Sequence, residues 1–158
     1  MRIHILIVLS VIFASCSRKT EEVKVNPNQY DSTLAKELDA DQFGMKAYVM
    51  AFLKKGPNRS TDTVIAKNLL MAHLQNIQRL AEEGKLIVAG PFLDDQDIRG
   101  IYIFNVSSLE EAKKLTETDP AIQAGSLVME LHPWYGSAAL VKITSIHKKL
   151  QKKSISEQ

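Results

Sequence analysis

Cysteine is almost absent from this sequence, and the one cysteine, Cys16, stands near the beginning of the chain. A single cysteine excludes an intramolecular disulfide. The 158 residues also lack a strong charge of either sign, because the formal net charge is only +2. The basic residues do not cluster on an aromatic or glycine-rich scaffold, so the sequence does not indicate a nucleic-acid-binding protein.

The sequence also lacks the motifs of several enzyme classes. It contains no Gly-x-Ser-x-Gly sequence, which would present a nucleophilic serine, and no phosphate-binding glycine loop. It has no strong set of metal ligands, since His73, Asp119 and His132 would form one only by coincidence of folding. We therefore expect neither a metal ion nor another cofactor.

Residues 1–15 have the three-part pattern of a secretory signal. The basic residue Arg2 comes first, an apolar run at residues 5–13 follows, and the small residues Ala14 and Ser15 end the segment. The apolar run is too short to span a bilayer as a helix. We expect residues 1–15 to be removed from the mature protein.

The residues around Cys16 resemble the lipobox of bacterial lipoproteins, whose cysteine is lipidated after cleavage. The matching residues are Phe13-Ala14-Ser15-Cys16, with phenylalanine where leucine is usual. An ordinary signal peptide with an incidental cysteine, or an anchor that is never cleaved, is the alternative. Since Ser17 rather than aspartate follows the cysteine, the resemblance implies a lipid anchor in the outer membrane, facing the periplasm.

Residues 16–44 are polar, with charges of both signs and no sustained apolar period, which is typical of a flexible tether. A short helix within residues 32–40 is compatible with this pattern. The folded domain is expected at residues 45–136. Residues 137–158 form an extension that begins with a strand or a short helix. It ends in a basic tail, which is either solvated or in contact with anionic lipid headgroups.

Within the domain, apolar runs predict strands at residues 45–54, 86–89, 98–106 and 127–134. A helix capped by Ser60 or Thr61 is expected to run to about residue 83, where Gly84 ends it. A second helix opens at the capping box Ser107-Ser108 and runs to about residue 118. The order β-α-β-β-α-β predicts a ferredoxin-like α+β fold, with a four-stranded antiparallel sheet and two helices. Both faces of the first strand are apolar, so we expect a second subunit to cover the free face.

One residue of the first predicted helix is polar although it lies on the apolar face. Ile65, Leu69, His73, Ile77 and Ala81 recur every four residues and form one face of the helix. A histidine in this apolar stripe must find a hydrogen-bond partner or incur a desolvation cost of about 1–3 kcal/mol.

The set of motifs in the domain resembles the YCII-related (YciI-like) family over residues 45–134. The resemblance rests on several short sequences taken in order: helical His73, AGPF at 89–92, Arg99-Gly100, EEA at 110–112, DPAIQAG at 119–125 and HPW at 132–134. It implies a dimeric α+β barrel, a homodimer of ferredoxin-like subunits, with a His–Asp pair in a cleft of each subunit. Some relatives isomerise ring-derived lactones or eliminate hydrogen halide from them.

On this basis His73 and Asp119 are the candidate catalytic pair of a small-molecule lyase or isomerase. Asp119 would hold the imidazole in one tautomer, and the other ring nitrogen would act as a base. Gly90 and Pro91 end the second strand near the same cleft, and Arg99 would bind a substrate carboxylate if it faces that cleft. The alternatives are a solvent-facing Arg99, a His73 that only stabilises the core, and a noncatalytic envelope module that binds an unknown small molecule.

The lipoprotein hypothesis is tested by mass spectrometry of protein extracted from the membranes of the native host. We expect a mature chain that begins at Cys16 and carries the mass of a diacylglyceryl group and an acyl chain. A mature protein with an intact, unacylated Cys16 would exclude the anchor.

Overall fold

The computed structural model describes residues 29–155, so the predicted signal sequence and Cys16 lie outside the described residues. The folded part of the chain forms one compact unit that begins at Asp31. Within residues 29–155, no helix combines the length and the apolar character that crossing a membrane requires.

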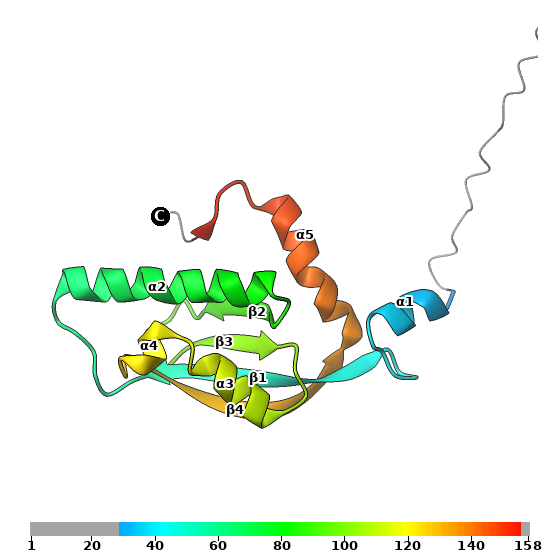
Figure 1. The fold of residues 1–158 in the computed structure, drawn as a ribbon, viewed down its shortest axis with the longest axis horizontal. Helices are drawn as coiled ribbons and strands as arrows, with labels where there is room; N and C mark the ends of the chain where they lie inside the picture. The colour runs from blue at the N-terminus through cyan, green and yellow to red at the C-terminus, as the bar shows by residue number, and fades with distance from the viewer. Residues whose placement is uncertain (1–28, 156–158) are drawn as a thin grey trace, which may run out of the picture. The chain divides into compact units, whose positions relative to one another are not determined.

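The domain is built on one antiparallel sheet with the strand order β2-β3-β1-β4. Its strands are β1 (Met45–Lys55), β2 (Leu86–Pro91), β3 (Ile98–Phe104) and β4 (Leu127–Ser137). The helices α2 (Thr63–Glu82) and α3 (Leu109–Thr116) join them in the order β-α-β-β-α-β and lie on one side of the sheet (Figure 1). The predicted ferredoxin-like α+β fold is confirmed.

Helix α2 begins at a different cap from the one expected. Asp62, rather than Ser60 or Thr61, is the N-cap, and its carboxylate accepts the backbone N–H groups of Val64 and Ile65 at 2.8 and 3.2 Å. A carboxylate also interacts favourably with the positive end of the helix dipole, which a hydroxyl cannot do. The expected stop at Gly84 is confirmed, with a φ of 68° that suits glycine.

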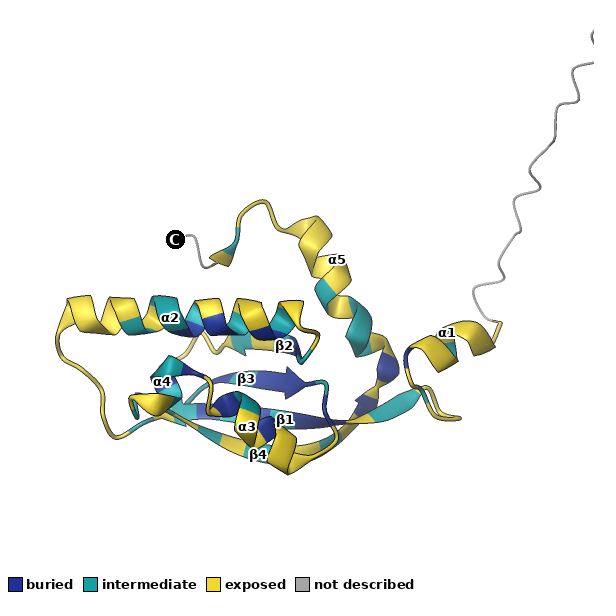
Figure 2. Cartoon of the chain, in the orientation of Figure 1, coloured by how far each residue is buried: buried dark blue, intermediate teal, exposed yellow. Residues whose placement is uncertain are grey.

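The predicted apolar stripe of α2 is only partly buried. His73 and Leu80 are buried, and Ile77 packs against the core. Ile65 was expected to face inward but is 55% exposed. The first turns of α2 are exposed, whereas the second half of the helix lies over the sheet (Figure 2). Ile65 belongs to the exposed first turns.

Two strands are longer than predicted, and each contains a proline. β2 includes Gly90 and Pro91, which were expected to break it, and β4 continues through Pro133 to Ser137. Both are edge strands. Proline lacks an N–H group, so it is tolerated where that group would face away from the neighbouring strand.

Four short helices complete the fold. α1 (Ser32–Glu37) confirms the helix expected within residues 32–40, and α4 (Pro120–Gln123) follows Asp119. After β4 the chain forms the 3-10 helix η1 (Ala138–Lys142) and then α5 (Ile143–Leu150). The helical alternative for the C-terminal extension is therefore the correct one.

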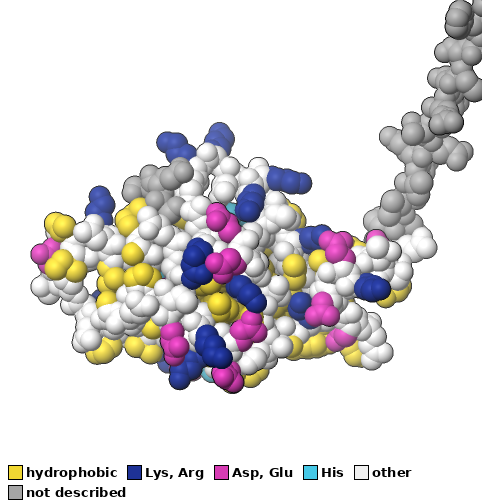
Figure 3. Space-filling model, viewed as in Figure 1, with side chains coloured by type: hydrophobic (Ala, Val, Ile, Leu, Met, Phe, Trp, Pro, Cys, Tyr) yellow, Lys and Arg dark blue, Asp and Glu magenta, His cyan; other side chains and the backbone are white. Residues whose placement is uncertain are grey.

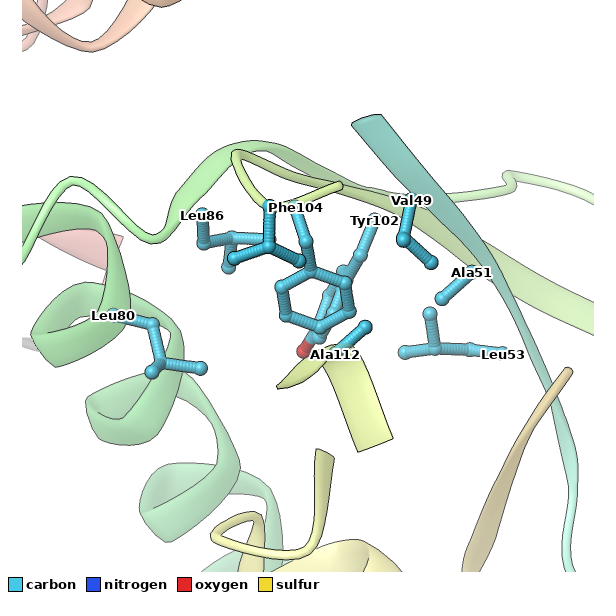
Figure 4. Close-up of a cluster of buried hydrophobic side chains, with 9 residues drawn as sticks. Val49, Ala51, Leu53, Leu80, Leu86, Tyr102, Phe104 and Ala112 are labelled. Carbon is cyan, nitrogen blue, oxygen red and sulfur yellow. The ribbon is translucent and has the colours of Figure 1, made fainter. Parts of the chain in front are cut away.

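The core lies between the sheet and the helices (Figure 4). Alternate residues of a strand point to the same face, so Val49, Ala51 and Leu53 of β1 face α2 and α3. They pack with aromatic residues of β3 and with Leu80 and Ala112 from the helices. This packing fixes the position of α2, and hence of His73, over the middle of the sheet.

The opposite face of the sheet is covered in part by the chain itself. Tyr48, Ile87 and Ile103 are buried there, and Leu140 and Val141 of η1 pack against them. We expected a second subunit to cover this face, and at this end the C-terminal extension does so instead. Met50 and Phe52, further along β1, are partly exposed.

Candidate active site

A histidine and an aspartate that are 46 residues apart in sequence are joined by a hydrogen bond between their side chains. The distance from His73 Nδ1 to Asp119 Oδ2 is 2.7 Å. Asp119 is completely buried, whereas the His73 side chain is 10% exposed. The structure therefore brings together the two residues that the sequence singled out as a pair.

Asp119 is held rigidly by the turn in which it lies. It is the N-cap of α4, and its Oδ1 accepts the backbone N–H of Ala121 at 2.9 Å. Pro120 occupies the first turn of that helix, where its fixed φ is favourable. One carboxylate oxygen is thus used by the turn and the other by His73.

Tyr102 is a third member of the site, which the sequence analysis missed. Its hydroxyl oxygen lies 3.3 Å from His73 Nε2, and the two rings are stacked at an interplanar angle of 17°. Tyr102 is 2% exposed and comes from the middle of β3. The alternation of β3 could have placed it on the helix side, but nothing local in the sequence separates Tyr102 from an ordinary core aromatic.

The two neighbours determine the tautomer of the neutral imidazole. An ionised carboxylate can only accept hydrogen bonds, so Nδ1 of His73 carries the hydrogen and donates it to Asp119. Nε2 then accepts the O–H of Tyr102. Burial raises the pKa of Tyr102, and the negative charge of Asp119 raises it further. Tyr102 is therefore protonated at neutral pH and remains a donor.

Asn76 lies one helical turn after His73. The sequence analysis missed it as well, because an asparagine in a helix is usually expected at the surface. It is 7% exposed. Its Oδ1 accepts hydrogen bonds from Arg79 at 2.7 Å and from the Thr118 hydroxyl at 3.1 Å. Its Nδ2 is buried and has no partner in the described part of the chain. Since Thr118 precedes Asp119, this network also joins α2 to the turn that carries the carboxylate.

The other candidate residues, Arg99, Gly90 and Pro91, belong to the neighbouring strands β2 and β3. The Arg99 guanidinium forms an ion pair with Asp95, at 2.7 Å from Nη1 to Oδ1. Asp95 lies in the hairpin between β2 and β3. Arg99 lies where the pairing of β3 with β1 shifts register, between Ile98 and Gly100. Gly90 and Pro91 form the end of β2, paired with Ile101 and Gly100.

Two hollows of the described surface are lined by residues other than the His–Asp pair. One, of about 350 Å³, is lined by Phe92, Ile98 and polar residues of the β2–β3 hairpin. The other, of about 270 Å³, lies between the end of α2 and α5. Neither is lined by His73 or Asp119, and the 10% exposed His73 side chain is the part of the pair that solvent reaches.

No group of three or more His, Cys, Asp and Glu side chains in residues 29–155 is arranged to hold a metal ion. His132 points away from His73, because it lies opposite Met50 on the other face of the sheet. There it contacts Glu130 Oε1 at 2.9 Å. The chemistry of the described site is accordingly that of an imidazole, a carboxylate and a phenol.

Comparison with known proteins shows similarity over this same domain. The YCII-related domain matches residues 47–135. The uncharacterized protein YjpA of Bacillus subtilis is 34% identical over 62 residues, which are 39% of this chain and 71% of YjpA. Among solved structures, 5-chloro-2-hydroxyhydroquinone dehydrochlorinase (TftG) from Burkholderia phenoliruptrix, in complex with 2,5-dihydroxybenzoquinone, is 26% identical. That match covers 54% of this chain and 92% of TftG, with a TM-score of 0.41.

The raised pKa of Tyr102 predicts a pH dependence of stability. Above about pH 10 the unfolded chain loses the Tyr102 proton, whereas the folded chain keeps it. The unfolded state then binds fewer protons, so stability falls as the pH rises, by about 1.4 kcal/mol per pH unit from this residue. Urea unfolding between pH 9 and 11 should therefore show a steeper loss for the wild-type chain than for Tyr102→Phe. Parallel losses would contradict the assignment.

Proposed function

We propose that this chain, which belongs to the YCII-related domain family, is a small-molecule lyase or isomerase that uses His73 and Asp119 to transfer a proton. The observation that carries the proposal is the 2.7 Å contact between the two side chains, in which the carboxylate is fully buried and the imidazole side chain stays 10% exposed. A buried carboxylate that fixes one ring nitrogen prepares the other to act as a base.

In the proposed reaction, Nε2 of His73 takes a proton from a carbon next to a carbonyl group. The electron pair of the broken C–H bond moves into the carbonyl group and forms an enolate. The imidazolium that results is stabilised by the negative charge of Asp119. For isomerisation the proton returns to another carbon of the enolate. For elimination a halide leaves the neighbouring carbon, and the net products are the unsaturated compound and hydrogen halide.

Tyr102 has a defined place in this scheme. At 3.3 Å its hydrogen bond to Nε2 is long, so a substrate C–H group can displace it. Because its pKa is raised, the phenol stays protonated and can turn to donate to the enolate oxygen. Arg99 has no role in the proposal, since its guanidinium is paired with Asp95 of the β2–β3 hairpin.

A noncatalytic ligand-binding module is the second candidate, and the low exposure of His73 favours it. Only 8% of the residue is accessible, which leaves a small area for contact with a substrate. In that case the His–Asp pair would recognise a ligand without moving a proton.

We also propose that the protein is a homodimer anchored to the cell envelope. Met50, Phe52 and Ile101 are partly exposed on the half of the sheet that η1 leaves open, and Val128 is 44% exposed beside them. A second copy placed there would bury these residues. The anchor is proposed from the lipobox-like sequence at Cys16.

Proton transfer is tested by hydrogen exchange in D₂O with a panel of unsaturated five-membered lactones, followed by ¹H NMR. We expect the wild-type chain to accelerate exchange at the carbon next to the carbonyl group. His73→Asn should lower this rate by about 10²- to 10⁴-fold, the usual contribution of a general base. The asparagine amide can still donate to Asp119, so the variant keeps the buried carboxylate partnered.

His147→Asn is the matched control, because His147 is exposed on α5, away from the sheet face proposed to bind the second copy. It should retain the wild-type rate. Equal rates for wild type and His73→Asn would exclude the catalytic role. Lactone binding without exchange, seen as shifts of protein NMR signals, would favour the noncatalytic module.

A further inference from the structure

The helix α5 lies outside the region that matches the family and is oriented in an unusual way. Thr144, Ser145 and Lys148 line the hollow between α5 and the domain, together with the end of α2 and the start of β2. A helix that packs on a domain normally turns its apolar face inward. Here the polar side of the helix faces the domain.

The apolar side of α5 faces away from the domain. Ile143, Ile146 and Leu150 are spaced three and four residues apart, so they form one stripe. They are 36%, 54% and 75% exposed, and Ile155 beyond the helix is 52% exposed. Figure 2 shows most of α5 as exposed. Single exposed apolar residues are ordinary, but an aligned stripe on a helix whose polar side is turned inward indicates a contact surface.

The charge of this segment is of one sign. Five lysines lie between residues 142 and 153, and no aspartate or glutamate occurs between Glu130 and Glu157. Lys142 pairs with Glu37 of α1. The other four, Lys148, Lys149, Lys152 and Lys153, form no ion pair with any residue in the described part of the chain. In Figure 3 lysine and arginine side chains project from this side of the molecule.

We propose that α5 and the basic segment after it, residues 143–155, bind the surface of an anionic lipid bilayer. The apolar stripe enters the boundary between headgroups and acyl chains, and the lysines contact the negative headgroups. A second copy of the chain is a poorer occupant of this stripe, because two such helices facing each other would bring lysines against lysines. The proposal does not depend on the proposed reaction, which uses residues on the other side of α2.

The position of α1 supports the same surface. The Lys142–Glu37 contact holds α1 beside the start of α5. The described chain begins just before α1, so the first described helix lies near the proposed bilayer-binding segment (Figure 1). An anchor in the N-terminal part of the chain, as proposed above, is compatible with α5 binding the same bilayer.

The proposal is tested by cosedimentation of residues 29–158, which contain the whole compact unit, with sucrose-loaded vesicles. One set of vesicles is pure phosphatidylcholine, and the other contains 30% phosphatidylglycerol. We expect binding to the anionic vesicles only, and a loss of binding as the salt concentration rises. Lys148→Gln with Lys149→Gln should lower the partition coefficient about thirtyfold. Ile146→Ser with Leu150→Ser should reduce binding at least as much.

Two double variants on other helices are matched controls. Lys113→Gln with Lys114→Gln removes the same charge from α3, and Val64→Ser with Leu70→Ser removes exposed apolar side chains from α2. Both should bind as the wild type does, and circular dichroism checks that every variant is folded. Equal binding to the two kinds of vesicle, or equal losses in the α5 variants and the controls, would overturn the proposal. Self-association in sedimentation velocity that Ile146→Ser with Leu150→Ser abolishes, without vesicle binding, would assign the stripe to a second copy.

Discussion

The hydrogen bond between His73 and Asp119 joins the middle of α2, which core packing holds over the sheet, to the turn that begins α4. A fully buried carboxylate without a partner is strongly unfavourable, and removing one member of such a pair typically costs about 3–5 kcal/mol. Here one oxygen of Asp119 is satisfied by the backbone of α4 and the other by the imidazole. The same contact that joins α2 to the start of α4 therefore also fixes the tautomer of the only buried histidine in the described chain. Stability and the proposed chemistry depend on one geometry.

Much of this arrangement could be predicted from local sequence. The order of strands and helices follows from apolar periodicity and from stops such as Gly84, and His73 stands out because it interrupts an apolar stripe. Asp119 was found through the resemblance to a family and through its place before a proline. These signals are local or lie in an ordered set of short motifs, which is why the sequence was sufficient for them.

The residues that the sequence did not reveal depend on long-range packing. Tyr102 becomes a site residue only because β3 passes beneath α2, and Asn76 only because Thr118 lies against α2. The strand ends at Pro91 and Pro133 were misjudged for a similar reason, since a proline breaks a central strand but not an edge strand. Arg99 shows the reverse case, in which a plausible ligand-binding residue pairs instead with Asp95 of the neighbouring hairpin.

The central claim is that Nε2 of His73 is a base that small molecules can reach, and its reactivity toward diethyl pyrocarbonate tests this most directly. The reagent modifies neutral imidazoles, and peptide mass spectrometry locates each modified histidine. We predict that His73 is modified, more slowly than the exposed His147, and that Tyr102→Phe increases its rate because Nε2 loses its hydrogen-bond donor. A His73 that stays unmodified in both proteins while His147 reacts completely would show a sealed, structural pair and contradict the account.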